Sequence, residues 1–137
     1  PCTAELKNLD AGDFEKAWGG ISSIQFTLPV IWTECKQRGY SLDQLINWMS
    51  TQPAKFIGKD HQKGQISSGY DADLVCWNPD KIYTITKDAI HHKNKLTPYE
   101  GESLYGLVYK TFLRGQKIYD NGEFLDNPTG KIILNNE

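Results

Sequence analysis

The spacing of apolar residues changes part-way along this chain, and that change constrains the fold more than any other feature. Up to about residue 58, apolar residues recur every three or four positions, which is the spacing of one helix face. From about residue 63 they alternate or run together in short stretches bounded by Gly, Asn and Pro, which is typical of strands and turns. We therefore expect a helical first part and a β-rich second part.

The first well-marked helix is predicted over residues 21–35, where apolar residues share one face. Basic residues followed by Gly39 mark its C-terminal end. Pro29 lies inside this pattern and has no N–H to donate. The helix therefore either bends at Pro29 or begins near Thr27.

A second helix is predicted from Ser41, because Ser41 and Gln44 match a capping box in which each side chain accepts a hydrogen bond from the other residue's backbone. Apolar residues then follow at helical spacing through Met49. Pro53 suits the first turn of a new helix, where its missing donor costs no hydrogen bond. We therefore expect the chain to restart a helix at residues 51–53 and to end it at Gly58.

The second part predicts short strands joined by tight turns. A strand entering from residue 72 is expected to stop at Asn78-Pro79. Strands this short have little margin as an independent sheet, so we expect them to pack on something else. The predicted strands cover 72–77, 82–85, 104–113 and 116–119, with hairpin turns at 114–115 and 121–122.

Composition and charge exclude several classes of protein. The 137 residues, 39% of them hydrophobic, suffice for one core of ordinary size. A net charge of −2 gives no electrostatic reason to expect nucleic acid or an anionic membrane as a partner. No run approaches the ~20 apolar residues of a membrane-spanning helix, and no signal-like segment opens the chain. Three scattered cysteines predict a reducing, intracellular location, with Cys35 and Cys76 buried as small apolar residues.

The titratable residues do not predict a self-contained catalytic or metal site. His61, His91 and His92 lack HxH or HExxH spacing, and we expect all three at the solvated surface. Asp71 and Asp73 flank a single alanine and would share one face of a strand. Their glycine-rich context favours a structural role, in which a carboxylate caps backbone donors at a turn.

One loop is a candidate for ligand binding. Trp18 precedes Gly19 and Gly20, and a glycine pair lets a ligand approach the main chain closely while an indole supplies an apolar wall. A tight turn leading into the following helix explains the same residues equally well, so the sequence by itself leaves both interpretations open.

Four further segments resemble the amidohydrolase superfamily. Residues 63–75, KGQISSGYDADLV, resemble its signature KGxIxxGxDADLV. Residues 50–54 resemble an STxPA element that precedes this signature, and residues 98–101 and 113–115 resemble its SPYxG and xxRG elements. Together these segments span most of the chain in the family's order, which makes the resemblance specific.

Within this superfamily, residues 1–7 and 16–23 look like the allantoinases. Hydantoinases, dihydropyrimidinases and dihydroorotases tend to have Asn-Gly where this chain has Gly19-Gly20. The resemblance implies a metal-dependent cyclic amidohydrolase, in which a water or hydroxide bridging two metal ions opens the hydantoin ring of allantoin to allantoate. It also implies a role in purine (ureide) breakdown.

The resemblance implies an α/β plus β fold made from parts of two domains. Residues 1–60 would be the last catalytic loop and closing helices of a (β/α)₈ TIM-like barrel, and residues 61–137 the C-terminal part of a small composite β-sandwich with a tail. The ligands of a binuclear zinc centre would all lie upstream of Pro1, so that this chain alone would be inactive. Substrate-binding residues would be Cys2, Gly19 and Gly20.

The implied partners are allantoin, the missing N-terminal part of the same barrel, and further subunits of a homotetramer. The implied location is cytoplasmic, with peroxisome or mitochondrion as alternatives. Three other interpretations stay open: a hydantoinase or dihydropyrimidinase, a non-catalytic scaffold like the dihydropyrimidinase-related proteins, and an independent α+β binding module.

Overall fold

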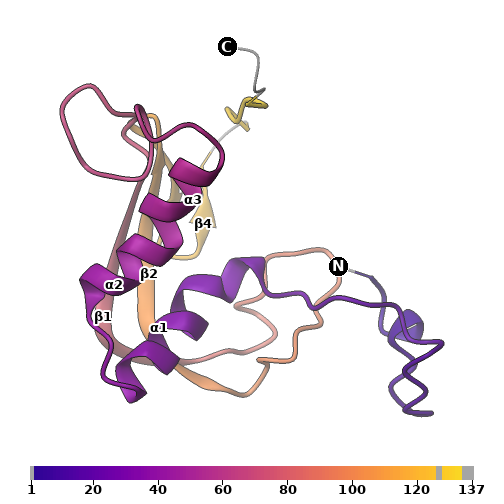
Figure 1. The fold of residues 1–137 in the computed structure, drawn as a ribbon. Coiled ribbons are helices and arrows are strands. Elements are labelled where there is room, and N and C mark those ends of the chain that lie inside the picture. The colour runs from indigo at the N-terminus through magenta and orange to yellow at the C-terminus, as the bar shows by residue number, and fades with distance from the viewer. Residues whose placement is uncertain (1, 126–127, 134–137) are drawn as a thin grey trace.

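The computed structural model describes residues 2–125 and 128–133, in which a run of helices lies against an antiparallel sheet (Figure 1). The N-terminal segment extends away from the sheet (Figure 1). The helical elements are η1 (Glu5–Lys7), η2 (Ile24–Phe26), α1 (Thr27–Gln37), α2 (Leu42–Ile46), η3 (Asn47–Thr51) and α3 (Gln52–Phe56). The strands are β1 (Leu74–Thr84), β2 (Ser103–Leu113), β3 (Gln116–Asp120) and β4 (Glu123–Phe124), and they pair in that order.

Helix α1 begins at Thr27. Of the two alternatives left open, the helix therefore starts near Thr27 rather than bending at Pro29. Pro29 is the third residue of α1, where an N–H has no partner inside the helix in any case. The short 3₁₀ turn η2 precedes α1, and the Ile24 side chain in that turn is almost fully exposed rather than part of a buried face.

The capping box at the start of α2 is confirmed. The Ser41 Oγ accepts from the Gln44 N–H, and the Gln44 Oε1 accepts from the Ser41 N–H at 2.9 Å. The predicted new helix near Pro53 is confirmed, because α3 begins at Gln52 with Pro53 in its first turn. The backbone between α2 and α3 also stays helical, through η3. The element η3 is a π-helical turn, and its wider geometry lets the chain pass a proline that lacks a donor without ending the helix.

The prediction that Asn78-Pro79 stops a strand is also wrong. Strand β1 continues to Thr84, and its pairing with β2 shifts register between Asn78 and Ile82, which forms a bulge. The Asn78 Oδ1 accepts from two backbone N–H groups inside this bulge, and the Trp32 Nε1 donates to the Pro79 carbonyl at 2.7 Å. A bulge is one of the few places where a strand accommodates proline.

Both predicted hairpin turns are confirmed. Arg114 and Gly115 have φ angles of 47° and 78°, and Asn121 and Gly122 have φ angles of 49° and 103°. Positive φ at both central residues is the type I′ geometry that matches the twist of paired strands. These turns join β2 to β3 and β3 to β4.

Two buried clusters form the core, and in each of them side chains from before residue 60 pack against side chains from after it. Helix α1 packs on β2 through them. The division at residue 60 into parts of two domains stays a prediction. The first cluster is Phe26, Ile85, Ile90 and Leu104, and the second is Trp32, Cys35 and Leu45 with Trp77 and Tyr105 packed against it.

The two predicted buried cysteines differ in environment. Cys35 is buried in the second cluster, as predicted. Cys76 is exposed, so its predicted burial is wrong. β1 is one of the two edge strands of the sheet, and several of its apolar side chains are exposed. No helix in the described ranges is both long and apolar enough to cross a membrane.

Candidate functional site

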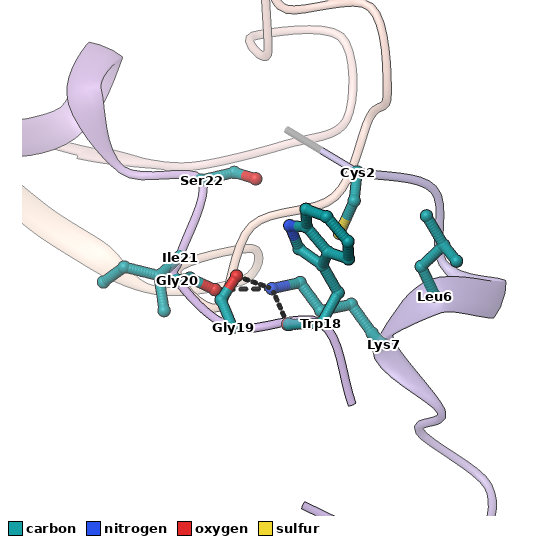
Figure 2. Close-up of a pocket in the computed structure, with 8 residues that line it drawn as sticks. All are labelled: Cys2, Leu6, Lys7, Trp18, Gly19, Gly20, Ile21 and Ser22. Carbon is teal, nitrogen blue, oxygen red and sulfur yellow. Dashed lines mark hydrogen bonds between the residues drawn. The ribbon is translucent and has the colours of Figure 1, made fainter. Parts of the chain in front are cut away.

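The loop that contains Gly19 and Gly20 forms one wall of a hollow of about 440 Å³ (Figure 2). The 3₁₀ turn η1 and the preceding residues form the facing wall. The residues that line the hollow are Cys2, Leu6, Lys7, Trp18, Gly19, Gly20, Ile21 and Ser22.

The three residues predicted to bind substrate, Cys2, Gly19 and Gly20, therefore line one hollow, although Cys2 lies 17 positions before Gly19 in the sequence (19 − 2). Gly20 has a φ of +77°, a conformation that glycine adopts without strain. A side chain at Gly19 would meet nothing within 4 Å. That these residues contact a substrate stays a prediction.

A lysine that the sequence did not single out holds this loop in place. The Lys7 Nζ donates to the carbonyl oxygens of Trp18, Gly19 and Gly20 at 2.8, 3.3 and 2.5 Å (Figure 2). The Trp18 N–H in turn donates to the Leu6 carbonyl at 2.7 Å. These contacts join residues eleven to thirteen positions apart, so no periodic pattern in the sequence points to them.

The segment that connects β1 to β2 also holds the loop that contains the glycine pair. The Thr97 hydroxyl donates to the Ser22 carbonyl at 2.8 Å. The Gln25 side chain donates to the Ala89 carbonyl and accepts from the His91 N–H, at 2.6 and 2.9 Å. The residues that follow the glycine pair are thus anchored on a segment that belongs to the β-rich part of the chain.

The predicted solvated surface position is right for His61 and wrong for His91 and His92. His61 is exposed. The His91 ring packs edge-on against Tyr119 and Phe124, and burial together with the nearby Lys95 charge lowers the pKa of its imidazole. Both ring nitrogens of His92 are buried without a hydrogen-bond partner. The reason is that the neighbouring Ile90 is fully buried in the first core cluster, which places the backbone of His91 and His92 against the core.

Asp71 and Asp73 have the predicted structural role. The Lys63 Nζ donates to the Asp71 and Asp73 carboxylates at 2.8 and 2.5 Å. The Asp73 Oδ1 also accepts from the Arg114 backbone N–H at 2.8 Å, so it caps a donor of the β2–β3 turn rather than of its own turn. Partial burial raises the pKa of Asp73, but the hydrogen bonds from Lys63 and Arg114 outweigh burial and leave the pKa below its usual value.

The described residues do not provide the ligands that a metal centre needs. Residues 2–125 and 128–133 contain no group of three or more His, Cys, Asp or Glu side chains that could hold an ion. The unpartnered His92 has no such neighbours. No step of a metal-dependent reaction is therefore assigned to these residues.

A second, larger hollow of about 670 Å³ lies between α1 and the sheet. Its lining is mainly apolar and includes Phe26, Leu107, Val108 and Phe124. Tyr83 also lines it, and burial is the main cause that raises the pKa of its hydroxyl to about 12. The described residues that line this hollow include no cluster of charged side chains, so the hollow does not have the arrangement of a catalytic site.

The sequence pattern of the amidohydrolase family matches residues 19–118, which include the glycine pair and reach into β3. The chain belongs to this family. Members at this level of similarity include the probable allantoinase 2 of Dictyostelium discoideum, 47% identical over 138 residues, and the allantoinase of Streptomyces avermitilis, 44% identical over 133 residues. The allantoinase of Saccharomyces cerevisiae is 42% identical over 135 residues.

These three matches cover 97–98% of this amidohydrolase chain but 26%, 29% and 28% of the relatives' own lengths. The chain thus spans between a quarter and a third of the relatives it matches. The predicted resemblance to allantoinases, hydrolases of the amidohydrolase family, is confirmed.

Solved structures place the fold in the same family. A D-hydantoinase superposes with a TM-score of 0.84 at 31% identity, over 94% of this chain and 28% of its own length. The D-hydantoinase (dihydropyrimidinase) of a Thermus species gives 0.82 at 29% identity, over 93% and 28%. The predicted amidohydrolase fold is confirmed at this level, with an antiparallel sheet of four strands.

Proposed function

We propose that this chain is part of an allantoinase, the hydrolase that opens the hydantoin ring of allantoin to allantoate. The observation that carries the proposal is the identity of 42–47% to proteins named allantoinase over nearly the whole chain. Identity to the superposed D-hydantoinases is lower, at 29–31%. The Gly19-Gly20 pair, in place of the Asn-Gly that hydantoinases tend to have, favours the same choice.

We infer that the chain works as one portion of a larger barrel enzyme. In this proposal, residues 1–60 complete the catalytic end of a (β/α)₈ barrel and residues 61–137 complete a composite β-sandwich. Large apolar side chains that lie uncovered support it, since such surface normally packs on other protein. Among the described residues, the most exposed are Phe14, Ile24 and Phe56, each above 90%, and Ile66 and Ile132, each 88%.

The proposed task of the hollow is to orient the substrate ring. Backbone groups at Gly19 and Gly20 would lie against the ring amides, with Cys2 and the Trp18 indole as the neighbouring walls. An ordered site of this kind lowers the barrier by holding the ring in a reactive geometry. The zinc that the allantoinase resemblance implies would be held by residues outside those described here, as would the attacking water.

The proposed partners follow from the same comparison. They are a small cyclic amide as substrate, the remainder of the barrel, and other subunits of a homo-oligomer, with a tetramer as the prediction. The predicted cytoplasmic location, or alternatively peroxisome or mitochondrion, is part of this proposal.

A hydantoinase or dihydropyrimidinase is the second candidate, because the superposed structures have those names. The test is to assay the full-length protein that carries this chain with allantoin, hydantoin and dihydrouracil, loaded with zinc. We expect kcat/KM for allantoin to exceed that for the other two by about 100-fold or more. A preference for hydantoin or dihydrouracil would favour the second candidate, and no turnover of any of the three would favour a non-catalytic scaffold.

A further inference from the structure

Ser22 is the last residue that lines the hollow, and a side chain from a distant part of the chain holds it in place. The Thr97 hydroxyl donates to the Ser22 carbonyl oxygen at 2.8 Å, across 75 positions of sequence. Thr97 is buried, with a fractional exposure of 5%. A buried hydroxyl is unfavourable unless it forms a hydrogen bond, so this contact fixes Ser22 relative to Thr97.

Thr97 is in turn fixed by the core. It directly precedes residues 98–101, the segment that resembles the SPYxG element of the family. The Tyr99 side chain of this segment packs on the first core cluster. The Gly101 N–H donates to the carbonyl of Ile85, a fully buried residue, at 2.8 Å. The segment that supports Ser22 is therefore tied to the core by packing and by a hydrogen bond.

A second contact holds the chain three residues further on. The Gln25 side-chain amide donates to the Ala89 carbonyl at 2.6 Å and accepts from the His91 N–H at 2.9 Å. Ile90 lies between these two residues and is fully buried in the first core cluster. The segment between β1 and β2 therefore holds the chain that leaves the hollow at both Ser22 and Gln25.

Apolar packing adds little at this wall of the hollow. The side chains of Ile21 and Ile24 are 62% and 93% exposed. The hydrogen bonds to Ser22 and Gln25 are therefore what places the wall against the β-rich part of the chain. The position of such a wall matters, because a shift of about 1 Å caused by a change far from the chemistry can cost about 100-fold in rate.

We propose that Thr97 is a positioning residue for the hollow: through the Ser22 carbonyl, its hydroxyl fixes the end of the wall formed by residues 18–22 and so sets the width of the hollow. This inference rests on the proposed function, because it takes the hollow as the site that orients the substrate ring. A wall at a fixed position selects a cyclic amide by its size. Removal of the hydroxyl should therefore weaken substrate binding more than it slows the chemical step.

The kinetic test compares Thr97→Val with Thr97→Ser in the full-length, zinc-loaded protein, assayed with allantoin. Valine has nearly the shape of threonine but no hydroxyl, whereas serine keeps the hydroxyl and loses a methyl group. Thr33→Val is the matched control, because Thr33 is also buried, at 7%, and does not line the hollow. Its hydroxyl donates to the Pro29 carbonyl at 2.7 Å and accepts from the Tyr105 N–H at 2.9 Å.

We expect Thr97→Val to raise KM about fivefold or more with kcat changed less than about threefold, and Thr97→Ser to keep both constants within about twofold of wild type. Thr33→Val should lower the unfolding temperature and leave KM unchanged, because its lost hydrogen bonds lie in the core. An unchanged KM in Thr97→Val, or an equal rise in Thr97→Ser or Thr33→Val, would overturn the proposal.

Gln25→Met is the second variant, because the Gln25 side chain is exposed and its replacement puts folding at less risk. It removes the contacts with Ala89 and His91. If Thr97→Val does not fold, this variant decides. A KM raised about threefold or more would support the proposal, and an unchanged KM would contradict it.

A further measurement separates failure of this inference from failure of the proposed function. Chymotrypsin cleaves after exposed Trp18 when the loop opens, and mass spectrometry identifies a fragment that begins at Gly19. Thr97→Val should increase the rate of this cleavage about threefold or more, whereas Thr97→Ser and Thr33→Val should not. If wild type does not hydrolyse allantoin, the proposed function is wrong, and the cleavage rates still decide whether Thr97 fixes the wall. Equal cleavage rates in wild type and Thr97→Val would overturn the positioning role.

Discussion

Gly19 and Gly20 are neighbours in the same loop, yet they tolerate a side chain differently. Gly20 has a positive φ, where a Cβ is strained, whereas Gly19 does not, and a Cβ at either position would meet nothing within 4 Å. We predict that Gly20→Ala destabilises the loop by about 1 kcal/mol, because of that strain. Gly19→Ala should be neutral or stabilising by about 0.5 kcal/mol, because alanine restricts the unfolded chain.

The measurement for this pair is the rate of chymotrypsin cleavage after Trp18 in each variant. Gly20→Ala should be cut faster than wild type and Gly19→Ala should not. Similar cleavage rates in the two variants would show that the backbone conformation at Gly20 does not hold the loop.

The Asp73 carboxylate gives the fold an acid-sensitive contact. Its pKa in the folded protein lies below the usual value of 3.8, so the stability it contributes is present above that value and is lost as pH falls through the lowered pKa. About 1 kcal/mol or less is expected, because the side chain is one-third exposed. The unfolding temperature of wild type should therefore fall more between about pH 6 and about pH 3 than that of Asp73→Asn.

The matched control is Asp10→Asn, which changes an exposed carboxylate in the N-terminal loop. It should keep the full acid sensitivity of wild type. An Asp73→Asn variant with the same pH dependence as wild type would mean that the hydrogen bonds from Lys63 and Arg114 to the Asp73 carboxylate do not stabilise the fold.

At single residues, the sequence predicted what depends on residue type and on near neighbours. The conformational freedom of the glycine pair and the contact of Asp73 with nearby Lys63 are of this kind. The hydrogen bond from the Arg114 N–H to Asp73 joins residues 41 positions apart and is not. The contacts of Lys7 depend on a loop closing over more than ten residues, and the burial of His91 and His92 depends on Ile90 packing into a core assembled from distant segments. Neither leaves a periodic signal along the chain.

Among the elements, β1 and β2 depend on one glycine at the place where β1 bulges. Gly106 has a φ of +100°, and a Cβ there would lie 2.9 Å from a ring carbon of Trp77. Both the backbone conformation and the space exclude a side chain. We predict that Gly106→Ala destabilises the protein by about 2–4 kcal/mol.

The check is the unfolding temperature of Gly106→Ala beside that of Gly115→Ala. Gly115 also has a positive φ, but a Cβ there meets only Ala72, at an ordinary 3.9 Å. The Gly115 variant should lose clearly less stability, since only strain acts on it. An equal loss of stability in both variants would show that the contact with Trp77 does not contribute to the effect of Gly106→Ala.

The elements themselves were predictable where a local signal sets them. The capping box at Ser41 and the type I′ turns at 114–115 and 121–122 depend on residues within one turn. The error concerns Pro79, which the sequence presents as a place where a strand ends. In the structure, a bulge in β1 accommodates this proline, and a hydrogen bond from Trp32, a residue of another element, stabilises the bulge.

Across the whole molecule, uncovered apolar side chains predict the behaviour of the 137-residue polypeptide by itself. We expect it to self-associate and to bind a hydrophobic dye, because Phe14, Ile24, Phe56 and Ile66 lie almost fully in solvent. Size-exclusion chromatography with light scattering measures this directly. A monomer that unfolds in one cooperative transition would instead favour an independent binding module.

The overall architecture could be predicted only through the family resemblance. Hydrophobic spacing separates a helical part from a β-rich part, but nothing local says that α1 packs on β2 or that Cys2 meets the glycine pair. Those contacts join residues far apart in the sequence, and the ordered set of short motifs is what places them in a known fold.

The most direct test of the central claim, that these residues supply one portion of an allantoinase, is a chimera assayed for allantoate release. The chain matches the allantoinase of Escherichia coli over its whole length at 39% identity, so it can replace the matching segment there. We predict allantoin turnover within about tenfold of the parent enzyme, and none from the polypeptide alone. A chimera that folds and assembles like the parent but releases no allantoate, or turnover by the polypeptide alone, would contradict the account.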